Sequence, residues 1–229
     1  MKKLKLLFVI GMILTLSLQT ATAFASTSFS DGVYTFVKTE NNNALITDCN
    51  LTQKTIEVPG AVLGYPVEGI GGYAFFSNSY IREVTLPPAV ISIGEYAFAG
   101  NEALESVTIP RWCETIADNA FWNSPNVTIK CLYDSKAFTY AAEKGIACEL
   151  LDGINLGDAN GDGSIDINDV TVLQRYVAEL ENLDGIRFLA ADINCDEDVD
   201  ISDATEIQSY LAEFEIQYPI GQPIQKKFS

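Results

Sequence analysis

Apolar positions recur every 23 residues in the first half of the chain, between residues 55 and 131. This spacing separates three isoleucines and three Ala-Phe pairs, namely Ile70, Ile93 and Ile116, and Ala74-Phe75, Ala97-Phe98 and Ala120-Phe121. A fixed period of about 20 to 50 residues is typical of solenoids, in which each turn buries its apolar face against its neighbours. The pattern therefore predicts stacked turns with the three phenylalanines aligned in the core.

Short alternating segments, most of them ended by Pro, predict the strands of this stack. The copies are Ile56-Glu57-Val58-Pro59 at the edge, Val84-Thr85-Leu86-Pro87, Val107-Thr108-Ile109-Pro110, and Val127-Thr128-Ile129, which is shortened by three residues. Side chains alternate between the two faces of a strand, so Thr85 and its equivalents point outward. Stacking then predicts one exposed ladder of Glu57, Thr85, Thr108 and Thr128, and a second of Thr55, Glu83, Ser106 and Asn126.

The ladders are interpreted either as a solvated sheet face or as a shallow platform for a protein or a polysaccharide. The candidate ligand surface of the repeats consists of Thr85, Thr108, Thr128, Trp112 and Trp122. An exposed indole can stack on a sugar ring or anchor a protein partner, and otherwise it covers the edge of the core. Phe76, Ala99 and Trp122 share one repeat position, which is a candidate for facing outward.

Solenoids need capping elements at their ends, and the sequence offers one at each end. Residues 33–37 and 44–47 predict a starting hairpin around the turn Asn41-Asn42-Asn43. Residues 134–145 predict a closing helix that ends at Gly145.

A helical period replaces the strand pattern after residue 150. Apolar residues three and four positions apart predict two amphipathic helices. The stripes are Val170, Leu173, Tyr176, Val177 and Leu180 in the first, and Ala204, Ile207, Tyr210, Leu211 and Phe214 in the second. A small all-α unit is therefore expected to follow the solenoid.

An acidic stretch of twelve residues precedes each predicted helix, and the two stretches begin 34 positions apart. Each has oxygen-bearing side chains at positions 1, 3, 5, 9 and 12, the spacing of a loop folded around Ca²⁺, which takes six to eight oxygen ligands. The predicted ligands, with position 7 contributing its carbonyl, are Asp158, Asn160, Asp162, Ser164, Asp166 and Asp169, and Asp192, Asn194, Asp196, Asp198, Asp200 and Asp203. The sequence thus predicts two Ca²⁺ ions in EF-hand-like loops.

The sixth loop position requires a sharp turn, often with positive φ. Gly163 occupies this position in the first loop, whereas Glu197 occupies it in the second. A strained residue other than Gly costs about 1 kcal/mol or more. Weaker Ca²⁺ binding is therefore predicted at the second loop.

Charge and composition narrow the classes of partner and chemistry. The formal net charge is −17, and residues 152–214 carry 16 acidic residues against Arg175 and Arg187. Such a surface favours divalent cations and disfavours nucleic acid and anionic membranes. The chain has no His, which excludes His-based catalysis and His metal sites. The five cysteines match no zinc or disulfide framework, and Cys131 and Cys148 are either a pair or two buried free thiols.

Residues 1–25 are predicted to be a secretory signal peptide. Lys2, Lys3 and Lys5 are followed by an apolar run from Leu6 to about Leu18 and by the small-residue site Ala23-Phe24-Ala25. The run is shorter than the roughly 20 residues of a membrane-spanning helix. The mature protein is expected to be secreted and to have no membrane span.

The repeats resemble the BspA-like branch of leucine-rich repeats found on bacterial surfaces. The resemblance rests on the pattern Ile-Gly-x-Tyr-Ala-Phe at residues 93–98, followed by Leu-x-x-Val-Thr-Ile-Pro at residues 104–110. It covers about residues 32–150 and implies a solenoid that serves as a scaffold for binding or adhesion.

Residues 156–214 resemble a type I dockerin, the module that binds a cohesin domain of a cellulosome scaffold. The resemblance rests on the paired loops with terminal Asp and on a Leu/Ile-x-x-Tyr stretch in both helices. It implies cohesin contacts at Ile167, Asn168, Gln174 and Arg175, and at Ile201, Ser202, Gln208 and Ser209. The internal symmetry implies docking in two orientations, and the Arg175/Ser209 difference either biases one of them or is simple divergence.

The expected fold class is α+β, with four segments along the chain. These are a signal peptide (1–25), a leucine-rich repeat domain with its caps (26–150), a dockerin domain (151–215) and a flexible tail (216–229), whose prolines are candidates for clasping the dockerin.

The expected protein is a secreted, non-catalytic cellulosome component of an anaerobic bacterium. Its dockerin binds a scaffoldin cohesin in a Ca²⁺-dependent manner, while the repeats bind an unknown protein or polysaccharide. No nucleophile–base motif appears among the repeats, whose carboxylates Glu57, Glu83 and Glu105 lie on an open surface. The alternatives are that the repeats form an enzyme inhibitor or adhesin, or a hydrolase of plant cell wall polysaccharide.

Overall fold

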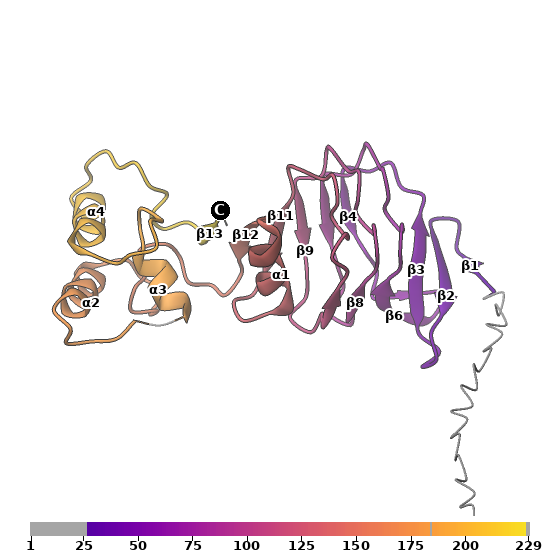
Figure 1. Cartoon of the computed structure of the whole chain (residues 1–229), viewed down its shortest axis with the longest axis horizontal. Helices are drawn as coiled ribbons and strands as arrows, with labels where there is room; N and C mark the ends of the chain where they lie inside the picture. The colour runs from indigo at the N-terminus through magenta and orange to yellow at the C-terminus, as the bar shows by residue number, and fades with distance from the viewer. Residues whose placement is uncertain (1–26, 184, 228–229) are drawn as a thin grey trace, which may run out of the picture.

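The protein has two parts that follow one another along the chain (Figure 1). A computed structural model describes residues 27–183 and 185–227, and the predicted signal peptide lies outside these residues. A stack of short strands forms the first part, and three helices form the second. This is the α+β arrangement expected from the change of period at residue 150.

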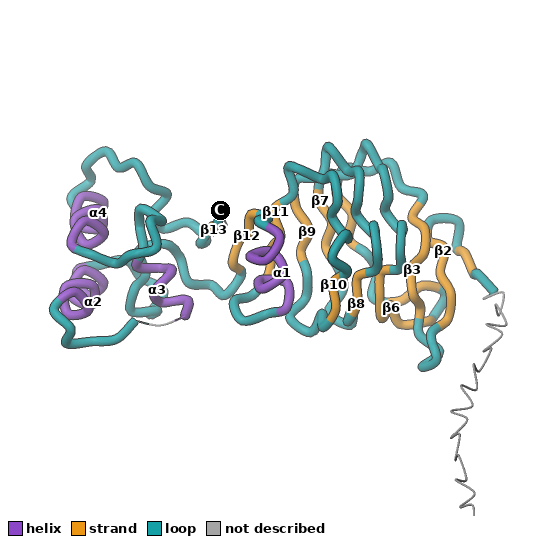
Figure 2. The backbone as a smooth tube through the Cα atoms, viewed as in Figure 1, coloured by secondary structure: helices purple, strands orange, loops and turns teal. Residues whose placement is uncertain are grey.

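The strands form two sheets that run along the stack (Figure 2). One sheet has the order β1-β2-β3-β6-β8-β10, with β5 paired to β6; its strands are β1 Phe29–Ser30, β2 Tyr34–Lys38, β3 Ala44–Cys49, β5 Ala61–Val62, β6 Tyr65–Ile70, β8 Ser92–Ile93 and β10 Thr115–Ile116. The other has the order β13-β12-β11-β9-β7-β4; its strands are β4 Thr55–Glu57, β7 Glu83–Thr85, β9 Ser106–Thr108, β11 Thr128–Cys131, β12 Ala147–Leu150 and β13 Gln225–Lys226. Strands of successive repeats pair in parallel, as a solenoid requires.

The predicted phenylalanine stack forms the centre of the solenoid. The rings of Phe75 and Phe98 are 5.0 Å apart, and those of Phe98 and Phe121 are 5.2 Å apart, with interplanar angles of 9° and 10°. Phe98 is fully buried between its two neighbours. The 23-residue spacing is therefore confirmed as the rung-to-rung repeat of the core.

A buried asparagine satisfies backbone groups beside this stack. The Asn101 amide nitrogen donates to the carbonyls of Phe75 and Phe98, at 2.9 and 2.8 Å. Its side-chain oxygen accepts from the backbone N–H of Asn78 at 2.6 Å. Buried turns need such partners because an unpaired backbone group is costly. The apolar repeat pattern contains no sign of this role, which was therefore not predicted.

The predicted polar ladder is correct for three rungs and wrong for the fourth. Thr85 pairs with Glu57 and Thr108, but Lys130, not Thr128, lies beside Thr108. Thr128 instead extends the second ladder beside Ser106, where Asn126 was expected. A shift of two residues leaves every side chain on the same face, so the alternating pattern alone does not distinguish the two registers.

Both caps of the solenoid lie where the pattern predicts them. β2 and β3 form the antiparallel starting hairpin. The closing helix α1 spans Lys136–Lys144, begins after the N-cap Ser135 and ends at Gly145, whose φ is 65°. A left-handed residue at this point is the usual helix terminator, and Gly adopts it without strain.

Cys131 and Cys148 lie on the neighbouring strands β11 and β12 at this end of the solenoid. Their sulfur atoms are 3.3 Å apart, and both residues are buried as free thiols. The hydrogen bond with Cys131 and burial raise the pKa of Cys148, while the same hydrogen bond lowers the pKa of Cys131.

Helices α2 (Ile167–Val177), α3 (Gly185–Ala191) and α4 (Ile201–Leu211) form the second part around a small core of their own. Val170, Leu173, Ala204 and Ile207 are buried there, where α2 packs against α4. The predicted stripes do not reach the core at their C-terminal ends. The exposed residues of the stripes are Val177, Leu180, Leu211 and Phe214. Helix α2 ends at Val177 and α4 ends at Leu211, so these residues lie at or beyond the helix ends.

The C-terminal segment packs on both parts of the chain and does not stand free as the expected flexible tail. Ile220 is buried in the helical core and Ile224 in the core of the solenoid. β13 pairs antiparallel with β12, so residues 225 and 226 add the last strand to the second sheet. The polar and Pro-containing composition of this segment gave no sign that Ile220 and Ile224, only four residues apart, would be buried in two different cores.

Candidate functional site

Each acidic loop is joined to its helix by a reciprocal cap. The Asp166 side chain caps α2, while Asp169 accepts from the Asp166 backbone N–H at 2.8 Å. Asp200 and Asp203 repeat the arrangement at α4, with a corresponding distance of 2.9 Å. Carboxylates at the start of a helix satisfy free N–H groups and interact favourably with the helix dipole. Positions 9 and 12 of the loops thus have a local structural role as well as their predicted role as ligands.

The carboxylate at position 1 organises the turn of each loop. Asp158 accepts from the backbone N–H groups of Gly161, Asp162 and Gly163 at 2.9 to 3.0 Å. Asp192 accepts from Asp196 and Glu197, both at 3.1 Å. The two loops therefore share one backbone shape, as their sequences predict.

Four carboxylates of the loops are almost completely buried. Asp158, Asp169, Asp192 and Asp203 are each at most 2% exposed. Burial raises the pKa of Asp169, Asp192 and Asp203 above the usual range for this side chain. Buried carboxylates are normally paired with a cation or bound to a metal.

The donor set fits a hard cation. In the part of the chain that the structure describes, no Lys or Arg forms an ion pair with Asp158, Asp169 or Asp203. Each loop adds an Asn and a backbone carbonyl to its carboxylates, and such all-oxygen sets suit Ca²⁺. Among the described residues, no three acidic, Cys or His side chains yet converge on one point.

Backbone conformation distinguishes the two loops. Glu197 has a φ of 73°, as predicted for the sixth position, where Gly163 has a φ of 87°. The fourth position is also left-handed, with Gly161 at 77° in the first loop and Cys195 at 59° in the second. The left-handed turn at Cys195 was not predicted, although the alignment of Cys195 with Gly161 indicates it. The second loop thus holds two strained residues where the first has two glycines.

The residues predicted to contact a partner lie at equivalent places on the two halves of the helical part. Seven of the eight are exposed and Ser209 is half-buried; the exposed ones are Ile167, Asn168, Gln174, Arg175, Ile201, Ser202 and Gln208. Arg175 pairs with Glu181 at 3.1 Å, while Ser209 donates to the carbonyl of Thr205. The exposed Leu180 and Phe214 occupy one further pair of equivalent positions. The two surfaces thus each carry two exposed apolar side chains, Ile167 and Leu180 on one and Ile201 and Phe214 on the other, among polar ones.

Aromatic side chains form a continuous ridge along the turns of the repeats, with Tyr73, Phe76 and Trp122 exposed and Tyr96 half-buried. Tyr73 contacts Phe76 and Tyr96 with ring centroids 5.4 and 5.2 Å apart, and Tyr96 contacts Trp122 at 6.3 Å. Trp122 is 62% exposed, whereas Ala99, at the same repeat position, is buried. We call Tyr73, Phe76, Tyr96 and Trp122 the aromatic ridge. Trp112 is 69% exposed. Among the described residues, no ring contact joins Trp112 to the aromatic ridge.

The predicted Thr surface is separate from the ridge. Thr85 is exposed, Thr108 and Thr128 are half-buried, and all three lie on strands of the second sheet. The ridge instead lies on the turns that follow β6, β8 and β10. The candidate residues of the repeats are therefore not brought together into one site.

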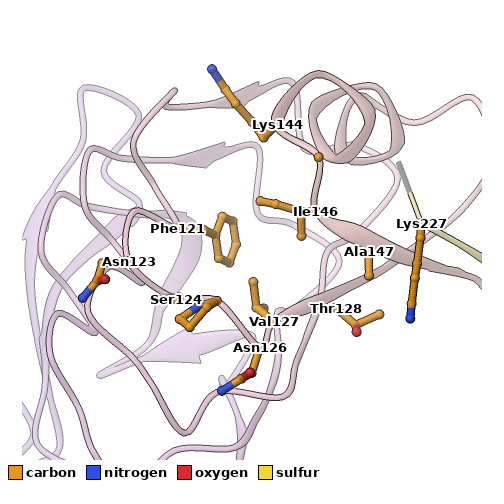
Figure 3. A pocket seen from close by; sticks show the side chains of 12 residues that line it. Phe121, Asn123, Ser124, Asn126, Val127, Thr128, Lys144, Ile146, Ala147 and Lys227 are labelled. Atoms are coloured by element: carbon orange, nitrogen blue, oxygen red, sulfur yellow. The ribbon is translucent and has the colours of Figure 1, made fainter. Parts of the chain in front are cut away.

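An open groove lies at the end of the repeats, between the last turn and the cap (Figure 3). Phe121, Val127 and Ile146 lie in its interior, and Lys144 and Lys227 extend from opposite sides. Lys144 pairs with Asp118 at 3.2 Å. The groove brings cations to the end of an otherwise acidic solenoid, and it adjoins the C-terminal segment.

Two carboxylates considered for catalysis are exposed on the sheet face, and the third is engaged in an ion pair. Glu57 and Glu83 are exposed, and Glu105 pairs with Arg82. Within the described residues, no helix combines the length and apolar character needed to cross a bilayer.

Family models match both parts of the chain. Residues 68–157 match the BspA type leucine-rich repeat region in six copies, and residues 156–212 match the dockerin type I domain. Type I dockerins are a calcium-binding family whose partners are cohesins. No curated protein matches the chain.

Solved structures with similar repeats come from three bacteria. A leucine rich cell surface protein of Faecalibacterium prausnitzii A2-165 is 28% identical over 51% of this chain and 35% of that protein, with a TM-score of 0.42. A leucine-rich repeat protein of Bacteroides capillosus ATCC 29799 is 26% identical over 45% of this chain and 70% of that protein, with a TM-score of 0.33. A leucine-rich repeat protein of T. pallidum is 14% identical over 45% and 71%, with a TM-score of 0.33. This chain thus spans about a third of the first of these proteins.

Proposed function

We propose that this chain, a BspA-type leucine-rich repeat region followed by a type I dockerin domain, is a secreted, non-catalytic subunit of a cellulosome. Its dockerin attaches it to a cohesin of a scaffoldin, and its repeats recognise a further ligand. The observation that supports attachment is the pair of equivalent exposed surfaces that begin at Ile167 and Ile201. Each surface follows directly from an acidic loop, so the loop fixes its position.

Two Ca²⁺ ions are proposed to fix these surfaces. The first would be held by Asp158, Asn160, Asp162, Asp166, Asp169 and the carbonyl of Ser164, and the second by Asp192, Asn194, Asp196, Asp200, Asp203 and the carbonyl of Asp198. Bound Ca²⁺ supplies positive charge to the buried carboxylates of each loop. The carboxylates at positions 1 and 12 then connect the ion to the turn and to the helix start.

Glu197→Gly is expected to tighten Ca²⁺ binding at the second loop. Glycine adopts the left-handed φ of 73° without strain, and relief of about 1 kcal/mol corresponds to roughly fivefold in affinity. Calorimetric titration of the variant and the unmodified chain measures the change. Gly163→Glu is the reciprocal variant and should weaken the first site. Equal affinities of the Glu197→Gly variant and the unmodified chain would contradict the role assigned to backbone strain.

Attachment is tested by titrating the chain with a panel of purified cohesin domains, in Ca²⁺ and in EDTA. Binding is expected in Ca²⁺ alone. Because either surface can serve, charge substitutions at one surface (Ile167→Asp with Asn168→Asp) should leave binding nearly intact. Substitution at both surfaces, adding Ile201→Asp and Ser202→Asp, should abolish it. Failure of every cohesin to bind would refute the proposed attachment, and loss of binding from a single surface would refute the two orientations.

The aromatic ridge is proposed as the recognition surface of the repeats. Tyr and Trp combine a large apolar area with few rotatable bonds, and they are enriched among residues that dominate binding energy. The ridge crosses three turns, so it offers an extended contact and not a single pocket. The Thr-bearing sheet face fits better as a solvated surface, since Thr108 and Thr128 are only half-exposed.

Trp122→Ala is expected to weaken ligand binding by the repeats about 30-fold, which is the effect of a 2 kcal/mol anchor. Retention of the protein on plant cell wall material and on secreted bacterial proteins provides the measurement. Trp112→Ala is the matched control, since it removes an equally exposed indole outside the ridge. An equal loss from both variants, or from Trp112→Ala alone, would locate the recognition surface elsewhere.

A further inference from the structure

The C-terminal segment connects the two parts of the chain through contacts at three levels. Ile220 is anchored in the dockerin core and Ile224 in the repeat core. Between them, Gly221 N–H donates to the Leu156 carbonyl at 2.8 Å, and Leu156 N–H donates to the Gln222 carbonyl at 2.9 Å. β13 then continues the sheet of the repeats, with Leu150 N–H donating to the Ile224 carbonyl at 2.8 Å. The segment therefore runs back along the linker between the two parts.

The last strand ends beside the second loop. The Lys226 ammonium lies 3.5 Å from a carboxylate oxygen of Glu197 and 4.0 Å from one of Asp192. The Lys226 side chain is 12% exposed and that of Asp192 is 2% exposed, so solvent screens the contact with Asp192 poorly, whereas the Glu197 side chain is 75% exposed. Asp192 is position 1 of the loop, the residue around which its turn is organised.

The first loop has a different environment. Its contacting cation is Arg187, which donates to the backbone carbonyl of Ala159 at 2.9 Å and pairs with Glu181 at 3.4 Å. Neither of these groups is a predicted ligand. Among the described residues, therefore, only the second loop has a cationic side chain in contact with a predicted ligand carboxylate. The equivalent position of the first loop has no such contact.

We propose that Lys226 is an internal counter-ion of the second loop, so that Ca²⁺ binding there and docking of the C-terminal strand on the repeats oppose each other. The inference rests on the proposed Ca²⁺ site at the second loop. A fixed positive charge beside Asp192 repels the incoming ion and lowers its affinity. Since coupling between two binding events is reciprocal, bound Ca²⁺ weakens the Lys226 contact by the same factor.

The consequence is a link between ion loading and the arrangement of the two parts. With the first loop loaded and the second free of Ca²⁺, Lys226 holds β13 in place and the repeats are fixed to the dockerin. With Ca²⁺ bound, the strand loses its polar anchor and keeps the apolar one at Ile224. The repeats then gain freedom of orientation relative to the docked module.

The test is a Ca²⁺ titration of the full chain followed by NMR, with the amide of Glu197 reporting the second loop and that of Gly163 the first. Lys226→Met is expected to tighten binding at Glu197 by about tenfold, within the usual range of coupling between sites. Lys226→Arg retains the charge and should behave as the unmodified chain. Lys227→Met is the matched control, since it removes the neighbouring charge that faces the open groove (Figure 3) and should change affinity by less than about twofold.

Hydrogen exchange of the Leu150 amide gives the reverse measurement. Once the first loop is filled, further Ca²⁺ should accelerate this exchange in the unmodified chain, by loosening β13, and have little effect in Lys226→Met. Equal shifts in Lys226→Met and Lys227→Met would overturn the proposal, because they would show a general charge effect. A Glu197 amide that does not respond to Ca²⁺, while Gly163 responds, would refute the second Ca²⁺ site itself and the coupling with it.

Discussion

Removal of Ca²⁺ is expected to unfold the dockerin while the repeats remain folded. Two ions, each at 100 times its dissociation constant, contribute about 5 kcal/mol together. This equals the whole stability expected of a small domain at the low end, and the helical core is small. Without the ions, burial of Asp158, Asp169 and Asp203 has no compensating charge, which further favours unfolding.

The chain allows the two parts to be followed separately in one thermal scan. Both tryptophans lie in the repeats, so their fluorescence reports that part alone. Far-UV dichroism at the helical minimum reports chiefly α2, α3 and α4. With EGTA, the helical signal should be lost at much lower temperature while the tryptophan transition keeps its midpoint. A helical transition that is insensitive to EGTA would contradict a structural role for Ca²⁺.

Phe98→Ala is expected to destabilise the repeats by about 4 kcal/mol, the usual cost of removing a large buried aromatic side chain. Phe98 is fully buried, and its ring stacks on Phe75 and Phe121 on either side. The substitution therefore interrupts the core between two turns, and stability in a solenoid depends on such contacts between neighbours.

Urea unfolding followed by tryptophan fluorescence measures the loss. Tyr80→Ala is the control, since this side chain is exposed on the same repeats and should change stability by less than about 0.5 kcal/mol. The dockerin transition should be unaffected in both variants. A loss from Phe98→Ala no larger than that from Tyr80→Ala would show that the stack does not stabilise the solenoid.

The features that could be predicted from the sequence are those encoded by a regular spacing of residues within a short segment. The 23-residue spacing specified the Phe98 stack, and the twelve-residue spacing specified loops with Asp166 and Asp200 at the helix starts. The left-handed turn at Glu197 followed from its loop position. The fourth-position turn at Cys195 was not predicted, because a non-glycine residue at this position gives no local sign of a left-handed turn.

The predictions were wrong or incomplete where two arrangements fit the local sequence equally well and contacts with distant residues select one of them. Lys130 lies beside Thr108 in place of Thr128, because a slip of two residues keeps the same faces and only the packing of the last turn selects one register. The aromatic ridge also requires the folded chain, since Tyr73 and Tyr96 share one repeat position but Trp122 occupies another, that of Phe76 and Ala99.

The sequence by itself determined the two modules, their order and the two acidic loops, because each is encoded by a short repeating pattern of residues. Only the tertiary structure decided where the C-terminal segment goes. No repeating pattern includes Ile220, Ile224 or Lys226. Ile220 packs in the dockerin core, Ile224 packs in the repeat core, and Lys226 pairs with a loop some 30 residues earlier. These contacts join residues that are far apart in the sequence. They include the burial of two isoleucines and the pairing of one lysine with Asp192, and they form only when both modules are folded and adjacent.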